Sequence, residues 1–137
     1  MSKDRSYSTA IHILTALAYR DPELTNSEDL ARSLKTNPGL VRRIMCKLSE
    51  KGLVTTIKGK GGGSRLAKSA QKISLGEIYL AVKDSPLFGS FDKEPLEECK
   101  VSCNIGEVLT RVYDDLEGDL VKNMNKVKLT EIIKEIG

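Results

Sequence analysis

Apolar side chains recur at spacings of three and four residues through the first half of the chain, which predicts short amphipathic helices. The first helix is expected over residues 6–20, and Asp21-Pro22 ends it because the residue before a proline avoids the helical region. Thr25-x-x-Glu28 has the form of a capping box and predicts a second helix over 28–34, with Thr25 as its N-cap. The apolar face of the first helix is expected to hold Tyr7, Ile11, Leu14, Leu17 and Ala18.

A third helix is predicted only two residues after the second, beyond Lys35 and Thr36. Asn37 is a favourable N-cap and Pro38 a favourable first helical residue, so we expect the helix to begin there and to end near Lys51. Two helices joined by so short a turn are typical of a helix-turn-helix. The inward face of the third helix is expected to hold Leu40, Val41, Ile44 and Leu48.

A β-hairpin is predicted directly after the third helix. Residues 53–57 are rich in β-branched side chains and alternate in polarity, and residues 64–66 read as a second short strand after the glycine-rich turn 59–63. This order of elements indicates a mainly α fold with a small β-hairpin, namely a winged helix-turn-helix.

A long C-terminal helix is predicted from near Asn104 to about residue 127, after a short helix over 75–82 that Ser74 caps. A helical tail over 129–136 follows it. The apolar positions of the long helix repeat at nearly heptad spacing, which is typical of a helix that pairs with another and so predicts a dimer interface. These positions are Ile105, Leu109, Val112, Leu116, Leu120 and Met124.

Three segments follow from these predicted elements. Residues 1–82 form the expected winged helix-turn-helix domain, residues 83–104 a loop that contains cysteines, and residues 105–137 the dimerisation helix with its tail.

Positive charge is concentrated in one block, residues 35–72. The block holds ten Lys or Arg side chains and a single acid, Glu50, which makes a formal charge of +9, whereas the whole chain carries +3. Charge that is segregated in this way indicates a polyanionic partner at the block. We expect double-stranded DNA, with the third helix in the major groove and the hairpin as the wing.

The predicted DNA contacts lie at the start of the third helix, further along it, and in the hairpin. Arg42 and Arg43 point about 100° apart on a helix, so we expect one of them to read a base and the other to bind a phosphate. Lys47 and Lys51 suit phosphates, and the glycines let the hairpin tip approach the backbone closely. The full set is Thr36, Asn37, Pro38, Leu40, Arg42, Arg43, Lys47, Lys51, Lys58, Lys60, Gly61, Gly62, Gly63 and Arg65.

Other interpretations of the block are weaker. The glycine run does not match the G-x-x-x-x-G-K-[ST] pattern of a nucleotide loop, and a strand rather than a helix follows it. A winged helix that binds protein would be expected to carry mixed or acidic charge on its third helix. A basic face that is merely solvated would need neither the helix-turn-helix spacing nor the wing.

Composition points away from enzymes and membrane proteins. The chain has 137 residues, the size of one domain, and its single histidine, His12, lies in an apolar helical run. Because no paired carboxylates and no metal-ligand spacing accompany it, we expect neither catalysis nor a metal site. No apolar run is long enough to span a membrane, and the N-terminus lacks the apolar core of a secretory signal, so we expect a cytoplasmic protein.

Several motifs carry a resemblance to a known family. They are LARSLKTNPGLVRRIMCKL, EKGLV, the G-x-GGG wing and ISLGEIYLAV. These segments resemble the Rrf-two family of bacterial transcriptional regulators, and the opening AIHILTALA is most similar to its YwnA-type branch. The resemblance implies a homodimeric DNA-binding regulator, which we expect to be a repressor, whose long helix crosses between subunits and which binds a palindromic operator.

The three cysteines raise the question of a cofactor. Relatives of the IscR and NsrR types hold an iron–sulfur cluster on three cysteines before the long helix, but here that segment supplies only Cys99 and Cys103, so no cofactor is expected. A helix N-terminus favours the thiolate, which makes redox or electrophile sensing by these two cysteines a hypothesis. The alternative is that the thiols simply pack, as we expect of Cys46 between the second and third helices.

Overall fold

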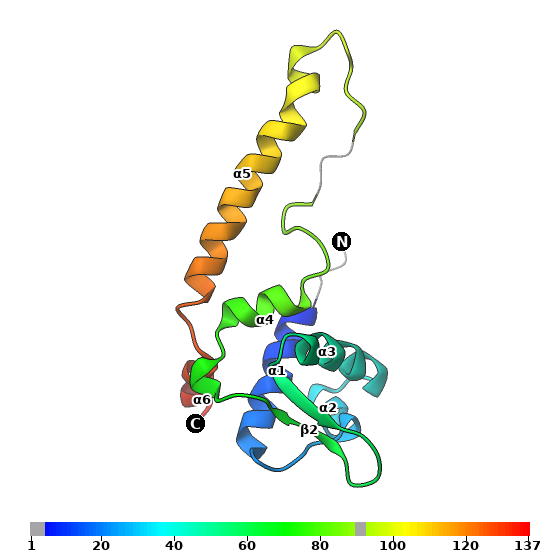
Figure 1. Ribbon diagram of the computed structural model, residues 1–137, viewed down its shortest axis with the longest axis vertical. Helices are drawn as coiled ribbons and strands as arrows, with labels where there is room; N and C mark the ends of the chain where they lie inside the picture. Colours follow the sequence, from blue (N-terminus) through cyan, green and yellow to red (C-terminus); the bar gives the residue numbers. More distant parts are fainter. Residues whose placement is uncertain (1–4, 90–92) are drawn as a thin grey trace.

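The molecule consists of a compact body and a long arm (Figure 1). The structure is a computed structural model that describes residues 5–89 and 93–137. The arm is the 25-residue helix α5 (Lys100–Met124), which is about 37 Å long and rises from one side of the body. The body contains α1 (Ser6–Arg20), α2 (Ser27–Leu34), α3 (Pro38–Glu50), β1 (Val54–Ile57), β2 (Gly63–Leu66), the 3-10 turn η1 (Ala70–Lys72), α4 (Leu75–Val82) and α6 (Leu129–Ile136).

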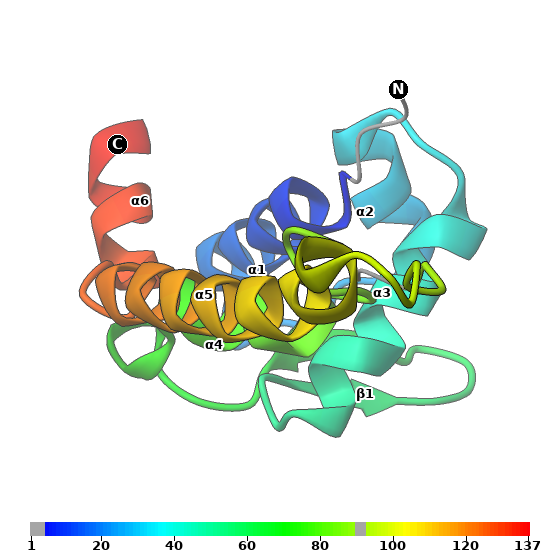
Figure 2. The same cartoon turned by 90° about the horizontal axis from the view of Figure 1, so that it is seen from above.

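The core of the body lies where α1, α3 and α4 pack together. The buried face of α1 includes Ala10 and Ile13 as well as the predicted Leu14 and Leu17, whereas Tyr7 and Ile11 are only partly buried. From α3, the side chains of Val41, Ile44, Met45 and Leu48 reach this core, and Leu40 is half-buried. Leu129 at the start of α6 is fully buried, so the C-terminal helix returns to the body after the arm (Figure 2).

The two strands form an antiparallel hairpin directly after α3. Val54 pairs with Leu66, and Ile57 pairs with Gly63. The predicted fold class is therefore confirmed, with α1, α2 and α3 followed by a wing and then by the long helix. None of the helices in the described ranges 5–89 and 93–137 is both long and apolar enough to cross a membrane.

The predicted cap of α2 is wrong. The N-cap is Asn26, whose Oδ1 accepts a hydrogen bond from the backbone N–H of Asp29 at 2.8 Å. Thr25 lies one residue earlier, where its backbone pairs with Ser64 of the wing. Because this pairing holds Thr25 in a β-bridge, the next residue, Asn26, becomes the N-cap.

The arm helix begins four residues earlier than predicted, at Lys100 rather than Asn104. Cys99 is the N-cap, and its Sγ accepts from the backbone N–H of Ser102 at 3.4 Å, while Ser102 Oγ accepts from the backbone N–H of Leu96 at 2.7 Å. Cys103 therefore lies in the first helical turn and not in the preceding loop. The helix also ends before residue 127, because the chain turns there and Val127 accepts a hydrogen bond from the N–H of Leu75.

Candidate nucleic-acid interface

The start of α3 is built as the sequence predicts. Asn37 is the N-cap, with its Oδ1 accepting from the backbone N–H of Leu40 at 2.9 Å, and Pro38 is the first helical residue. The turn from α2 is tight because Lys35 adopts a left-handed conformation with a φ of 53°. Asn37, Arg42 and Arg43 at and near the start of α3 are exposed.

The wing lies beside α3, and residues of both elements line a hollow of about 440 Å³. Arg42 and Cys46 of α3 line it from one side, and Thr56, Lys58 and Ser64 line it from the hairpin. The structure thus brings two predicted DNA-contacting residues, Arg42 and Lys58, to one groove although 16 positions separate them in the sequence. Cys46 is exposed in this groove, so the prediction that it packs between α2 and α3 is wrong.

A two-residue bridge fixes the wing to the body. The backbone N–H of Thr25 donates to the Ser64 carbonyl at 2.9 Å, and the N–H of Ser64 donates to the Thr25 carbonyl at 2.8 Å. At Gly63, a Cβ would lie only 2.8 Å from the Thr25 carbonyl oxygen, so glycine is required for this close approach. The bridge holds the hairpin at a set place relative to the N-terminus of α2.

The glycines of the wing tip have distinct local roles. A Cβ on Gly62 would lie 2.1 Å from the carbonyl oxygen of Ile57, which leaves no room for a side chain. Gly61 has a φ of 78°, a conformation that favours glycine, but it has open space around it. The tip therefore stays thin, and Lys58, Lys60 and Gly61 are exposed on it.

Two cations of the predicted set are engaged by acids of the same chain. Arg42 lies 4.0 Å from the carboxylate of Glu28, and both side chains are exposed. Lys47 pairs with Asp84, which follows α4. The remaining cations of the set, Arg43, Lys51, Lys58, Lys60 and Arg65, are exposed on α3 and the hairpin.

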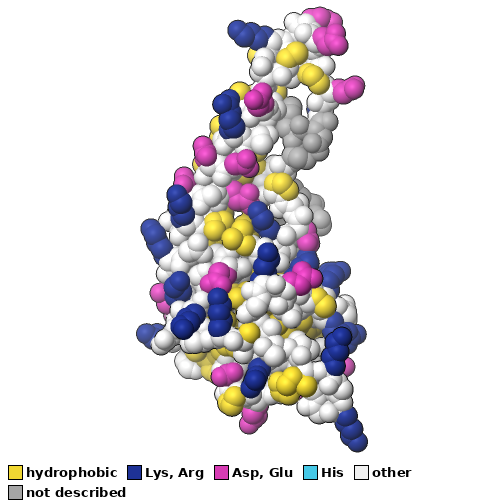
Figure 3. Space-filling model, viewed as in Figure 1, with side chains coloured by type: hydrophobic (Ala, Val, Ile, Leu, Met, Phe, Trp, Pro, Cys, Tyr) yellow, Lys and Arg dark blue, Asp and Glu magenta, His cyan; other side chains and the backbone are white. Residues whose placement is uncertain are grey.

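Charge differs between the body and the arm on the face shown in Figure 3. Lys and Arg side chains gather around the body, whereas acidic and basic side chains are mixed along α5. This distribution agrees with the sequence, in which the +9 block 35–72 covers α3, the hairpin and η1.

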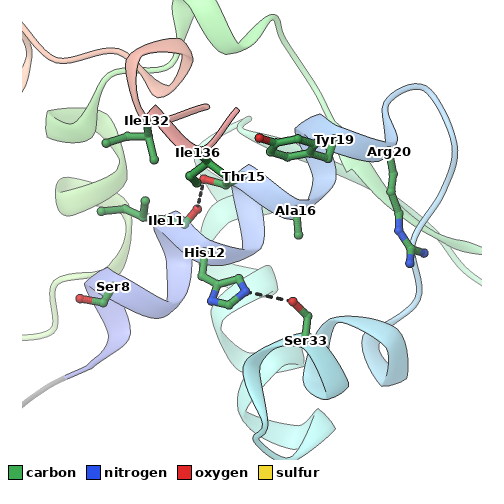
Figure 4. A pocket seen from close by; sticks show the side chains of 10 residues that line it. All are labelled: Ser8, Ile11, His12, Thr15, Ala16, Tyr19, Arg20, Ser33, Ile132 and Ile136. Carbon is green, nitrogen blue, oxygen red and sulfur yellow. Dashed lines mark hydrogen bonds between the residues drawn. The ribbon is translucent and has the colours of Figure 1, made fainter. Parts of the chain in front are cut away.

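A separate cavity of about 500 Å³ lies between α1, α2 and α6 (Figure 4). It is mainly apolar, with Ile11, Ala16 and Ile132 among its walls, and none of the predicted DNA-contacting residues lines it. His12 is exposed at its edge, where Nε2 lies 3.0 Å from Ser33 Oγ. The described residues that line this cavity include no carboxylate, so His12 has no acidic partner there.

A polar cluster ties the middle of the arm to α4. Glu117 of α5 accepts hydrogen bonds from Tyr79 Oη at 2.7 Å and from Lys83 Nζ at 3.1 Å. These two hydrogen bonds lower the pKa of Glu117. Burial, followed by the hydrogen bond to Glu117, raises the pKa of Tyr79 to about 12. The cluster therefore holds a carboxylate and a neutral phenol between α4 and α5.

Elsewhere α5 is only partly covered, for example where Tyr113 stacks on Phe88 with their ring centres 4.9 Å apart. None of its 25 residues, all of which the structure describes, is buried. Of the predicted dimer stripe, Val112 is 44% exposed and Leu116 is 49% exposed, and Leu120 is exposed as well. Ile105, Leu109 and Met124 are half-buried. So much apolar surface on one helix is unusual in a monomer.

The two thiols before and within the first turn of α5 lie at the far end of the arm (Figure 1). Both are free. Cys99 is half-buried as the helix cap, and exposed Cys103 donates a hydrogen bond from Sγ to the Leu96 carbonyl at 3.4 Å. Within the part of the chain that the structure describes, no three His, Cys, Asp or Glu side chains are grouped so as to hold a metal ion.

Comparisons with known proteins agree with this architecture. The family model described as "Rrf2: Iron-dependent Transcriptional regulator" matches residues 4–135. YwnA of Bacillus subtilis (strain 168) is 29% identical over 129 residues, covering 94% of this chain and 95% of YwnA. The HTH-type transcriptional regulator NsrR of Oceanobacillus iheyensis is 30% identical over 134 residues, covering 90% of each chain.

A solved structure of a Lactobacillus plantarum protein has the same fold. Its TM-score is 0.79 at 22% identity, and the match covers 96% of this chain and 89% of that one. The family match spans nearly the whole chain, and members of this family are DNA-binding transcriptional regulators rather than enzymes. The chain belongs to the Rrf2 family of transcriptional regulators.

Proposed function

We propose that this protein is a homodimeric, sequence-specific repressor that binds a palindromic operator through α3 and the wing. The observation that carries the proposal is the coincidence of the +9 block with the exposed faces of these two elements. In a winged helix-turn-helix, residues at the start of the second helix of the motif meet base edges, and here that helix is α3. The proposed contacts of α3 and the turn before it are those of Thr36, Asn37, Pro38, Leu40, Arg42, Arg43, Lys47 and Lys51, and those of the wing are Lys58, Lys60, Gly61, Gly62, Gly63 and Arg65.

Arg43 is the better candidate for reading a base. Arg42 turns toward the groove beside the wing, where it lines the hollow and lies near Glu28. Arg43 is one residue further along, about 100° around the helix, and is exposed on the outer face. Arginine in the major groove pairs in bidentate fashion with guanine, so we assign a guanine to Arg43 and a phosphate to Arg42.

The arm supports dimerisation. A helix with no buried residue and a heptad-like apolar stripe is stabilised when a second copy covers that stripe. Two-fold symmetry would set two α3 helices in successive major grooves, about 34 Å apart, and the operator would share this symmetry. A bound dimer of this kind obstructs polymerase at an overlapping promoter, which is the basis for assigning repression.

The family description names an iron-dependent regulator, which raises the question of whether this chain can hold an iron–sulfur cluster. Clusters are held by four ligands that are mostly thiolates. At the arm's end this chain offers Cys99 and Cys103, and Cys99 Sγ already caps α5. The donor set of one chain does not fit a cluster, so no step of the proposed mechanism uses iron.

The two arm thiols are proposed to respond to oxidants or electrophiles. Cys103 is exposed and both thiols are free, which leaves at least one of them accessible to a reagent. The alternative is that they only cap and pack the first turn, as Cys99 does. Replacing both Cys99 and Cys103 by serine distinguishes sensing from packing. If the DNA affinity of this double variant still responds to the thiol oxidant diamide, thiol sensing is contradicted.

The test of DNA binding is a titration of the protein against random-sequence and selected duplexes at several salt concentrations. Each phosphate contact should lower the logarithm of affinity by about 0.9 per unit of the logarithm of salt concentration. A steep slope together with an enriched sequence supports the proposal. A protein-binding winged helix would instead show weak, sequence-independent binding and no enriched duplex.

A further inference from the structure

Two adjacent residues after α4 form ion pairs with two different helices. Lys83 Nζ pairs with Glu117 Oε1 of the arm at 3.1 Å, and Asp84 pairs with Lys47 of α3. Consecutive Cα atoms are about 3.8 Å apart, so a single peptide unit connects the arm to the helix that faces DNA. Segments distant in sequence thus meet at one point, since 37 residues separate Lys47 from Asp84 and 34 separate Lys83 from Glu117.

We propose that Asp84 masks Lys47 from a DNA phosphate, and that the position of the arm sets, through Lys83, how firmly this mask is held. The inference rests on the proposed function, because it assigns Lys47 to a phosphate. Asp84 and Lys83 act as positioning residues, since neither is assigned a contact to DNA.

The electrostatics favour masking. An ammonium group that is paired with a carboxylate offers less net charge to a phosphate, and the carboxylate itself repels the phosphate. Lys47 belongs to the basic block, and Asp84 is an acid that the fold brings against it from outside the block. The Asp84 side chain is 64% exposed, so solvent weakens the pair and a phosphate can compete with it.

The ion pair between Lys83 and Glu117 of the arm is less exposed to solvent than the pair between Asp84 and Lys47. The Glu117 side chain is only 15% exposed, and it accepts from both Tyr79 and Lys83. Lys83 Nζ also lies over the Tyr79 ring, 5.8 Å from its centre. When α5 shifts relative to α4, Lys83 moves with it and carries Asp84 along, and the exposed pair with Lys47 is the one that yields. Occupancy or chemistry at the arm would in this way alter the charge presented by α3.

The mask is tested by binding to a fluorescently labelled random-sequence duplex, because a phosphate contact does not depend on sequence. Asp84→Asn should tighten binding by about two- to fivefold, the range that an exposed ion pair supports. It should also steepen the salt dependence by about one phosphate contact. Lys47→Met should weaken binding, and adding Asp84→Asn to it should change nothing further. Glu94→Gln, in the same segment and with the same change in charge, is the matched control and should have less effect than Asp84→Asn.

The coupling to the arm is tested by Lys83→Met. Releasing Asp84 from the arm should tighten binding toward the level of Asp84→Asn, and should add nothing in the Asp84→Asn background. Unchanged or weaker binding by Asp84→Asn, or an equal gain from Glu94→Gln, overturns the mask. If Asp84→Asn raises the affinity for DNA but Lys83→Met does not, the proposed coupling between the arm and the Asp84–Lys47 pair is overturned. Wild-type protein that fails to bind duplex DNA would contradict the proposed function itself, which distinguishes the two failures.

Discussion

At the scale of single residues, neighbouring arginines on α3 have different surroundings. Arg42 lines the groove shared with the wing and lies 4.0 Å from Glu28, whereas Arg43 is exposed on the outer face. This difference is the basis on which we propose separate tasks for them on DNA, with Arg42 positioning the protein and Arg43 reading sequence.

Arg43→Ala should reduce affinity for the selected operator by about 1–3 kcal/mol and relax the preference at one base position. Lys60→Ala, at the wing tip, should weaken binding to all duplexes about equally, because a phosphate contact carries no sequence information. Competition binding against a set of single-base operator variants measures both. A loss for Arg43→Ala that is the same on every sequence would remove its assignment as a base reader.

Sequence patterns predict helix N-caps correctly where the capping interaction is between residues close together in the chain. Asn37 caps α3 and Ser74 caps α4, as expected from residues three positions apart. Thr25 matches the same kind of signal and fails, because a strand residue 39 positions later competes for it. The exposure of Cys46 and the ion pair between Lys47 and Asp84 also depend on segments that are distant in the sequence. Neither could therefore be predicted from local sequence patterns.

At the scale of elements, the wing depends on its attachment to the body. Thr25 and Ser64 exchange two backbone hydrogen bonds, and Gly63 permits this approach. Charge in the hairpin is useful only if the hairpin is held beside α3. The bridge therefore contributes to the position of the hairpin lysines relative to α3.

Gly63→Ala should lower the free energy of unfolding by about 1–3 kcal/mol, because the added Cβ would lie 2.8 Å from the Thr25 carbonyl oxygen. Gly61→Ala is the control in the same turn: its surroundings are open, and only its φ of 78° opposes a side chain. Urea denaturation gives both values. A smaller loss for Gly63→Ala than for Gly61→Ala would show that the bridge does not restrain the wing.

The cluster between α4 and α5 makes the arm's attachment sensitive to pH. The pKa of Glu117 is lowered by hydrogen bonds from Tyr79 and Lys83, so its charged form stabilises the folded state. That contribution is complete above the ordinary carboxyl pKa of 4.5 and is lost as the pH falls through the lower value of the folded state.

Glu117→Gln should therefore be less stable than wild type at pH 7, by about 1–2 kcal/mol. The difference between the two proteins should narrow as the pH falls below 4.5. Thermal unfolding of both proteins at pH 7 and at acidic pH measures it. A difference that stays constant over this range would mean that the charge of Glu117 has no part in the attachment.

The boundaries of elements were the less predictable feature of the fold. The heptad-like stripe identifies α5, but its start at Lys100 depends on Cys99 as the N-cap and on Ser102 Oγ, which holds the Leu96 N–H. Cysteine is an uncommon N-cap, so the sequence pattern predicts a start near Asn104 instead. The difference matters, because the predicted start leaves Cys103 in the loop, whereas the observed start places it in the first turn of α5.

At the scale of the whole molecule, the body has a hydrophobic core, whereas the arm that is joined to it has none. Among residues 5–89 and 93–137, the large side chains that are fully buried all lie outside α5, and the arm leaves Val112 and Leu116 exposed. Exposed apolar residues at heptad-like spacing are best stabilised by a second copy of the same helix.

Leu116→Asp should yield monomers that bind DNA poorly, because the charge lies at the middle of the stripe. Gly118→Asp is the matched control, since it makes the same change in charge about 200° away on α5, and nothing lies within 4 Å of an added Cβ there. Analytical ultracentrifugation gives the mass of each variant. If Leu116→Asp remains a dimer, the assignment of the dimer interface to α5 is contradicted.

The most direct measurement is hydroxyl-radical footprinting of the protein on a duplex selected from a random-sequence pool. A dimer that reads DNA with two α3 helices should protect two patches related by a two-fold axis, with centres about one helical turn apart. The selected sequence should be palindromic, and Arg43→Ala should weaken it at one position of each half-site. A single patch without symmetry, or a pool that yields no preferred sequence, would contradict the proposal.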